Sequence, residues 1–210
     1  MIAIHSKDIS VNTLVSEIKN FTNIPYIPSL EFIDFRTLCR IRGKTKGIRL
    51  DREHSWLSAY FKKELLHLYG EPSQHSSPAG LPSLSLRWID DRIGWGVFAE
   101  RDFQALEFIT EYSGLVRKRT KQDCKNAYCF EYPIKAGKIS PYVIDAQDMG
   151  GISRYVNHSE EPNLTSLSVH LEGFNHIILY SIKPIPKGTQ LCYDYGPGYW
   201  RARPKPRVFQ

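Results

Sequence analysis

Two stretches decide the fold of this chain: Arg154-Tyr-Val-Asn-His-Ser-Glu-Glu-Pro-Asn163 and Gln190-Leu-Cys-Tyr-Asp-Tyr-Gly196. Each places a short polar or aromatic cluster beside an apolar run of the kind that forms a strand. One short pattern of this length is weak evidence of function, whereas two patterns in a fixed order are much more specific. The pair is therefore the most informative feature of the sequence.

The composition indicates a folded protein. The 210 residues are 41% hydrophobic and 12% aromatic, which is enough apolar material for a core and argues against disorder. This length suits one domain with an appendage, or two small domains. The formal net charge of +6 would suit an acidic partner or proximity to nucleic acid, but a soluble basic protein explains it equally well.

The four cysteines predict neither a disulfide framework nor a metal site. They stand at positions 39, 124, 129 and 192, without a Cys-x-x-Cys pair or zinc-finger spacing. We expect free thiols in a reducing compartment. The sequence has no apolar run of the roughly 18 residues that a membrane span needs, and its start lacks the pattern of a cleaved signal peptide. An intracellular protein is therefore expected.

Three regions follow one another along the chain. Residues 1–83 are expected to form a helical N-terminal region and linker, residues 84–196 the main domain, and residues 197–210 a tail. Ile9, Leu14, Val15 and Ile18 have roughly helical spacing, and residues 53–69 show a clearer helical pattern. Pro, Ser and Gly between 71 and 83 indicate a loop or linker. From Leu84 onward, short runs of branched and aromatic residues predict strands.

The two motifs resemble the signatures of SET-domain protein lysine methyltransferases, written Asn-His-Ser-x-x-Pro-Asn and (Tyr/Phe)-Asp-Tyr-Gly. Four further blocks resemble the family pattern and stand in the family's order: Arg92–Ala99, Ile109–Gly114, Ala127–Phe130 and Tyr142–Ala146. The resemblance implies a mainly β fold with short helices, a SET-type β-clip with a C-terminal pseudoknot, preceded here by the helical N-terminal region. Within that family the sequence resembles the compact type, without pre-SET or zinc post-SET modules.

The resemblance also implies S-adenosyl-L-methionine as cofactor. Its binding residues would be Gly94, Trp95, Gly96, Asn157 and His158, with Trp200 packed over the adenine. Taken alone, the two glycines would indicate no more than a tight turn, and the Asn-His pair no more than a polar pair near a turn. Trp200 could equally anchor the C-terminal tail.

Three tyrosines are the expected catalytic residues. By resemblance, Tyr195 is the catalytic tyrosine, Tyr128 a partner lining the lysine channel, and Tyr193 the position that limits how many methyl groups are transferred. Methyl transfer needs a neutral amine, and neutralising a lysine of pKa ~10.4 at pH 7 costs roughly 4 to 5 kcal/mol. An apolar aromatic channel lowers that pKa, and tyrosine hydroxyls orient the amine.

The sequence departs from many SET proteins at Glu160, where relatives carry a zinc-binding cysteine. No cysteine follows Cys192 either, so we expect no metal. Cysteine clusters of the pre-SET type are also absent, as in compact SET proteins of viruses and intracellular bacteria. The enzyme would then work in the nucleus on chromatin, or be made in a bacterial cytoplasm and delivered to a host nucleus.

Two functions fit these residues. The first is a protein lysine methyltransferase whose partner is an exposed lysine of a histone tail or histone-like protein. The alternative is a non-catalytic SET-like module that binds chromatin or basic-tailed proteins; intact Tyr195, Asn157 and His158 favour the enzyme. Direct nucleic-acid binding is not expected, because no recognition motif or basic-aromatic stripe is present. No membrane partner is expected, and a homodimer is left open.

Overall fold

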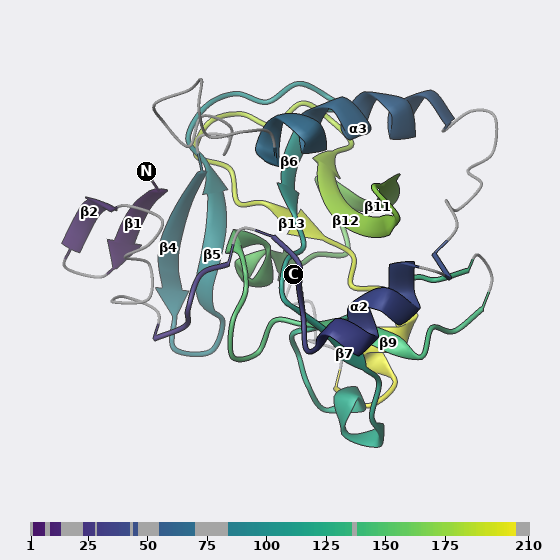
Figure 1. Ribbon diagram of the computed structural model, residues 1–210. Coiled ribbons are helices and arrows are strands. Elements are labelled where there is room, and N and C mark those ends of the chain that lie inside the picture. Colours follow the sequence, from purple (N-terminus) through teal and green to yellow (C-terminus); the bar gives the residue numbers. More distant parts are fainter. Residues whose placement is uncertain are drawn as a thin grey trace.

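The computed structural model describes residues 2–6, 9–13, 23–27, 29–42, 44–45, 55–69, 84–135 and 138–204. Within these residues the strands form three sheets, and the helices are few and mostly short (Figure 1). The prediction of a mainly β fold with short helices is therefore confirmed. None of the described helices is long and apolar enough to cross a membrane.

The first sheet joins the N-terminus of the chain to the main domain. Its strand order is β2-β1-β4-β5, with bounds Ile9–Thr13, Ile2–Ser6, Leu84–Asp90 and Gly94–Ala99. Strand β1 runs parallel to β4, and β4 forms an antiparallel hairpin with β5. The N-terminal strands thus extend the sheet that carries the Gly94–Ala99 block.

The expected helix from Ile9 onward is wrong over residues 9–13, which form β2. Ile9, Val11 and Thr13 are β-branched and alternate with Ser10 and Asn12, a period-2 pattern that favours a strand. An antiparallel partner, Ile2–Ser6, decides between the two periodicities. Residues 14–18 and the expected linker at 71–83 lie outside the described residues. The helix expected over 53–69 is confirmed as α3, Ser55–Tyr69.

The second sheet brings the two signature motifs together. Its order is β10-β13-β11-β12-β6, with bounds Asn157–His158, Cys192–Tyr193, Leu164–Leu171, Phe174–Ser181 and Phe108–Glu111. Strand β13, from the second motif, lies between β10 and β11 and is parallel to both. The pseudoknot itself stays a prediction.

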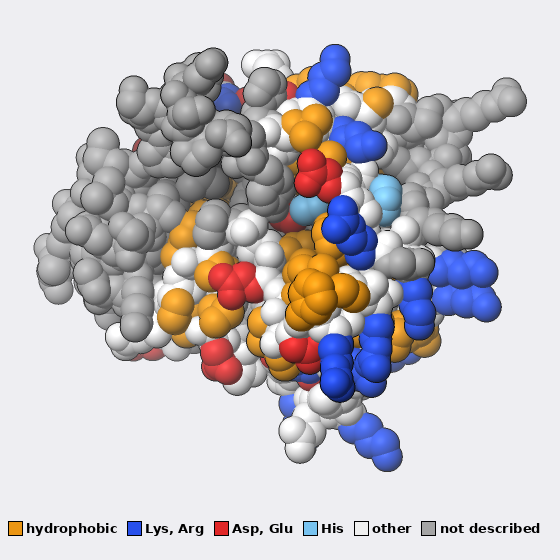
Figure 2. Space-filling view, in the orientation of Figure 1, with side chains coloured by type: hydrophobic (Ala, Val, Ile, Leu, Met, Phe, Trp, Pro, Cys, Tyr) orange, Lys and Arg blue, Asp and Glu red, His pale blue; other side chains and the backbone are white. Residues whose placement is uncertain are grey.

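The third sheet has the order β3-β7-β9-β8, with bounds Glu31–Phe32, Leu115–Lys118, Tyr142–Asp145 and Cys129–Glu131. Strand β8 is an edge strand. Among the described residues three short helices lie between strands along the chain, α2 Phe35–Arg42, η2 Lys121–Cys124 and η3 Ile152–Tyr155, and α4 Pro197–Trp200 follows β13. Lys and Arg side chains gather on the side of the molecule where α2 lies, and the arginines of α2 are exposed (Figure 2).

Helix α3 is docked on the second sheet. Leu57, Phe61 and Leu65 are buried, and they form one cluster with side chains of β6, β11 and β12. The Phe61 ring lies 5.0 Å from the Tyr180 ring and 6.5 Å from the Phe108 ring, measured between centroids. The N-terminal region therefore contributes part of the core that supports the site-bearing sheet.

Phe61→Ala should lower the free energy of unfolding by about 3 to 5 kcal/mol, because it removes a fully buried ring and leaves a cavity. Leu66→Ala is the matched control, since Leu66 lies on the same helix but is 47% exposed, and should cost about 0.5 kcal/mol or less. Urea denaturation of both variants measures the difference. Equal stability of the two variants would show that α3 does not stabilise the main domain.

Candidate active site

The side-chain amide of Asn163 joins the two motifs. Its Nδ2 donates to the Gln190 carbonyl at 2.8 Å, and its Oδ1 accepts the Cys192 N–H at 2.9 Å. The Asn163 backbone N–H also donates to the Cys192 carbonyl at 3.1 Å. These bonds fix the register in which Asn157 pairs with Cys192 and His158 with Tyr193.

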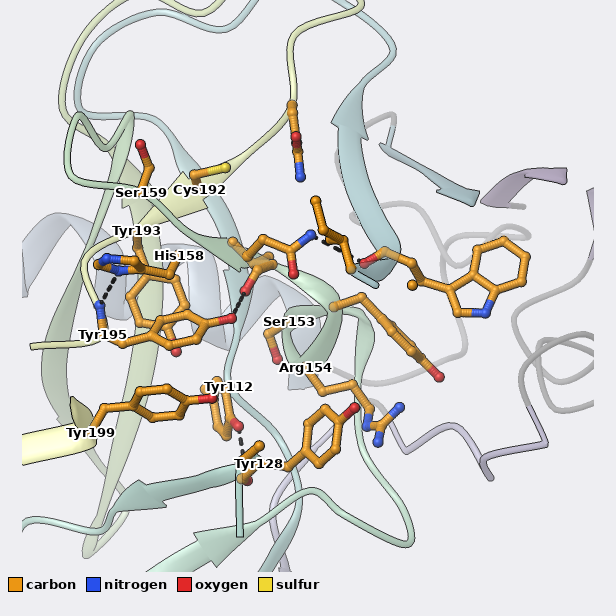
Figure 3. Close-up of a pocket in the computed structure, with 18 of the residues that line it drawn as sticks. Tyr112, Tyr128, Ser153, Arg154, His158, Ser159, Cys192, Tyr193, Tyr195 and Tyr199 are labelled. Atoms are coloured by element: carbon orange, nitrogen blue, oxygen red, sulfur yellow. Dashed lines mark hydrogen bonds between the residues drawn. The ribbon is translucent and has the colours of Figure 1, made fainter. Parts of the chain in front are cut away.

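A cavity of about 1310 Å³ opens where these strands meet the turn between β4 and β5. Its lining includes the turn at 92–95, residues 153–159 of and beside the first motif, and residues of the second motif and the segment after it. Figure 3 shows the residues of the two motifs facing Tyr112 and Tyr128, which also line the cavity. A cavity of this size, with convergent polar and aromatic groups, suits a cofactor and part of a substrate. It is the larger of two cavities that meet in the site.

A hydrogen bond joins the turn to the first motif, between two residues that line the larger cavity. Asn157 Nδ2 donates to the Trp95 carbonyl at 3.2 Å. Gly94 has a φ of 79°, a conformation that side chains disfavour, so the turn needs glycine there. Gly96 does not line the cavity, and a Cβ at this position would lie 2.7 Å from Cδ1 of Ile89. Its lack of a side chain serves close packing beneath the turn.

His158 of the first motif is hydrogen-bonded to Tyr195, the candidate catalytic residue of the second motif. Its Nδ1 accepts the backbone N–H of Tyr195 at 3.3 Å (Figure 3). The Trp200 ring packs edge-on against the His158 ring at 4.7 Å and stacks with the Tyr195 ring at 6.3 Å, between centroids. Trp200 does not line the cavity, but packs against three residues that do: His158, Tyr195 and Tyr199. Its indole N–H is buried and has no hydrogen-bond partner within the described residues.

Five aromatic rings form a continuous cluster beside the larger cavity. We call Tyr112, Phe130, Tyr193, Tyr195 and Tyr199 the aromatic cluster. Successive ring centroids lie 4.6 Å apart for Tyr195–Tyr199, 4.8 Å for Tyr193–Tyr195, 6.5 Å for Phe130–Tyr193 and 5.0 Å for Tyr112–Phe130. Tyr193 and Tyr195 thus present their rings to one region, as expected for alternate residues of a strand.

The hydroxyl groups of the cluster are neutral at physiological pH. Burial raises the pKa of Tyr112, Tyr193 and Tyr195 well above the usual 10.0. The Tyr195 hydroxyl donates to the Val156 carbonyl at 2.8 Å, and the Tyr112 hydroxyl to the Tyr128 carbonyl at 2.9 Å. These hydroxyls can orient a bound group through hydrogen bonds, but their high pKa values disfavour a tyrosinate base.

A smaller cavity of about 570 Å³ reaches the aromatic cluster from another side. Both cavities are lined by Ala127 and by four of the cluster's tyrosines: Tyr112, Tyr193, Tyr195 and Tyr199. Strand β8 also borders the smaller cavity, through Cys129, Phe130 and Glu131. The cluster therefore lies where the two cavities adjoin, an arrangement that suits two ligands that react where they meet.

The structure brings most of the predicted residues to the larger cavity. Its lining includes Gly94, Trp95, Tyr128, Asn157, His158, Tyr193 and Tyr195. Gly96 and Trp200 lie outside that lining. The roles assigned to all these residues stay predictions.

Sequence reasoning missed Tyr112 and Arg154 and assigned Tyr199 no role. The Arg154 guanidinium lies 4.1 Å from the Tyr128 ring centroid, and its Nε donates to the Ala146 carbonyl at 2.7 Å. Both missed residues belong to quoted motif blocks, Arg154 in Arg154–Asn163 and Tyr112 in Ile109–Gly114. The sequence gives no signal that separates these two residues from structural ones, because a buried tyrosine or a paired arginine usually has a structural role.

No group of three or more His, Cys, Asp or Glu side chains that could hold a metal occurs among the described residues. All four cysteines are free thiols. Burial raises the pKa of Cys129 to about 12 and that of Cys192 to about 11, so both stay protonated at neutral pH. The expectation of a metal-free protein remains a prediction for elemental analysis.

Residues 94–196 match the SET domain family, and this part of the chain is a SET domain. The relatives are histone-lysine methyltransferases. The chain is 37% identical over 109 residues to human histone-lysine N-methyltransferase 2B, covering 49% of this chain and 4% of that protein. It is 32% identical over 114 residues to Drosophila melanogaster Su(var)3-9, covering 49% and 18%. The chain thus spans a small part of the curated relatives.

A solved structure has a similar fold over most of the chain. ATXR5, crystallised with histone H3.1 mono-methylated on R26, aligns with a TM-score of 0.60 and 17% identity. The alignment covers 86% of this chain and 85% of that one. At this identity the likeness supports the fold alone.

Proposed function

We propose that this chain is an S-adenosyl-L-methionine-dependent protein lysine N-methyltransferase that acts on histones or other basic proteins. The observation that carries the proposal is the meeting of two cavities at the partly buried aromatic cluster, which contains Tyr193 and Tyr195. A methyltransferase needs such a junction, because donor and lysine must approach from separate openings and meet in line. The SET relatives support the reaction class.

The larger cavity has the chemistry to hold the cofactor. Arg154 and Asn157 are suited to the carboxylate end of an amino acid, and His158, backed by Trp200, offers an aromatic surface for a base. The turn at Gly94 leaves the backbone open to close approach, since glycine has no Cβ. When bound, S-adenosyl-L-methionine supplies a methyl group on a positively charged sulfonium.

The aromatic cluster would prepare the lysine. Buried rings around a lysine amine disfavour its charged form and lower its pKa, which makes the nucleophilic neutral amine accessible. The Tyr195 hydroxyl is fixed by its bond to the Val156 carbonyl, so its remaining lone pairs have a set direction. Tyr195 would therefore align the amine through hydrogen bonding rather than remove its proton.

Tyr195→Phe tests the activity directly. Wild-type protein incubated with histones and labelled S-adenosyl-L-methionine should transfer methyl groups, and the variant should lose at least about 100-fold in rate because the orienting hydroxyl is gone. Calorimetry should find cofactor affinity nearly intact. Full activity of the variant would refute the catalytic assignment, and an inactive wild type that still bound histones would favour the non-catalytic alternative.

Tyr193→Phe should keep turnover but move the products toward dimethyl- and trimethyl-lysine. Tyr193 is 8% exposed and contacts Tyr195, so its hydroxyl, with any water that it holds, takes up room beside the amine. Mass spectrometry of the methylated substrate distinguishes the products. An unchanged methylation state would mean that Tyr193 does not limit the space in the channel.

Asn157→Ala should weaken cofactor binding by about tenfold, because it removes the amide that spans from the first motif to the Trp95 carbonyl. Calorimetric titration with S-adenosyl-L-methionine measures the change. Gln104→Ala is the control, since Gln104 is exposed and lies in a loop that does not line the larger cavity. Unchanged affinity in folded Asn157→Ala would place the cofactor elsewhere.

We further propose that the protein acts at chromatin, in the nucleus of the organism that makes it or in a host nucleus after delivery from a bacterial cytoplasm. The histone-methylating relatives support a chromatin role. The three regions 1–83, 84–196 and 197–210 are retained as a proposal, with β1 and α3 packed against the SET part. A homodimer and the absence of direct nucleic-acid binding stay predictions.

A further inference from the structure

The smaller cavity is positively charged. Its ionisable Lys, Arg, Asp and Glu residues are Arg119, Lys121, Arg201 and Arg203 with two carboxylates, Asp123 and Glu131. These residues surround the opening through which a substrate lysine would reach the aromatic cluster, if the proposed function holds. Their charges therefore act on the residues that flank that lysine.

Both carboxylates are already paired with arginines. Asp123 is largely buried and lies 2.7 Å from Nη2 of Arg117, and it also accepts the Thr120 N–H at 2.7 Å. Glu131 lies 2.7 Å from Nη2 of Arg119 and accepts the Ser140 N–H at 3.1 Å. Neither carboxylate is left to neutralise a basic peptide in the cavity.

Three cations remain without a carboxylate partner among the described residues. Lys121 and Arg201 are exposed and form no ion pair there. Arg203 lies with its guanidinium 4.1 Å from the Tyr199 ring centroid and donates from Nη1 to the Tyr199 carbonyl at 2.9 Å. Its Nη2 is buried and has no hydrogen-bond partner in the described part of the chain. A guanidinium nitrogen so placed is suited to an anionic group of a ligand.

The rest of the cavity fits a polypeptide. Among the described residues β8 is the edge strand of its sheet, and an extended peptide can pair with such an edge through main-chain hydrogen bonds. The aromatic cluster lines the same cavity and offers apolar surface to a long side chain. These features favour a peptide over a nucleic acid. The phosphates of a nucleic acid would pair with the basic residues, but would leave the edge strand and the aromatic cluster without a partner.

We propose that the preferred substrate is a lysine flanked by acidic residues. The proposal rests on the proposed methyltransferase function and narrows its substrate. Aspartate or glutamate beside the target lysine would meet Lys121, Arg201 and Arg203, whereas arginine in those places would be repelled. A histone or another basic protein can still contain such a lysine, because the local sequence decides the fit.

Three peptides with a single central lysine test the proposal. Their flanking residues are acidic, alanine only, or arginine, so that each peptide keeps one methylation target. Fluorescence anisotropy with S-adenosylhomocysteine present measures binding, and labelled S-adenosyl-L-methionine measures kcat/KM. The acidic peptide should bind about tenfold more tightly than the arginine peptide at low salt, with the alanine peptide between them. The difference should shrink as salt rises.

Charge-reversal variants locate the effect. Lys121→Glu combined with Arg201→Glu should reverse the order of the acidic and arginine peptides. Lys183→Glu together with Lys187→Glu makes the same change in net charge at exposed positions that line neither cavity, and should leave the order unchanged.

The outcomes are separable. Methyl transfer without preference for the acidic peptide, or an order unchanged in Lys121→Glu with Arg201→Glu, would overturn the charge proposal and leave the proposed function standing. Preferential binding of the acidic peptide with no methyl transfer to any peptide or histone would support the charge preference and refute the activity. A DNA duplex is the competing ligand. If DNA displaced the acidic peptide from the wild-type protein and did not bind to Lys121→Glu with Arg201→Glu, nucleic acid would be the ligand and the proposal would be refuted.

Discussion

The amide of Asn163 is the contact on which the site depends. It bonds the Gln190 carbonyl and the Cys192 N–H, and it is only 8% exposed, so water competes poorly for these groups. This clamp holds β13 between β10 and β11 in a fixed register. A shift of β13 by one residue would turn Tyr193 to the other face of its strand. The Asn163 hydrogen bonds therefore help to set the positions of Tyr193 and Tyr195 within the aromatic cluster.

A second network lies beside the smaller cavity, which two of its members, Asp123 and Asn126, line. Arg117 bonds both Asp123 and Asp145, at 2.7 and 2.6 Å, and Asp145 accepts Asn126 Nδ2 at 2.9 Å. Removing Arg117 would leave two largely buried carboxylates without their cation, and breaking a buried ion pair in this way typically costs about 3 to 5 kcal/mol. Asn126 in turn accepts the Tyr128 N–H at 2.9 Å through its Oδ1. The network thus extends from strands β7 and β9 to Tyr128, which lines the larger cavity.

Prediction from the sequence succeeded where the motifs themselves form the site. Asn157, His158, Tyr193 and Tyr195 come together as expected, because pairing of β10 with β13 joins two quoted stretches. It failed at Ile9–Thr13, because helical and strand periodicities overlap in so short a run and only the pairing with β1 decides between them. The charge of the smaller cavity could not be read from the chain. It depends on which arginine neutralises which carboxylate, and those partners come from different strands and turns.

The aromatic cluster and the basic residues act on the same quantity, the pKa of a lysine that enters between them. Burial against Tyr193 and Tyr195 disfavours the ammonium form, and nearby positive charges on Lys121, Arg201 and Arg203 disfavour it further. The same cations would repel a lysine in a basic sequence before it reached the cluster. Acidic residues beside the substrate lysine would offset that repulsion by pairing with the exposed cations. Because solvent and salt screen exposed charges, those pairs would act only weakly on the buried amine. The rings around the amine would still lower its pKa. The exposed cations would then serve recognition of the substrate, and the aromatic rings would serve activation of its lysine.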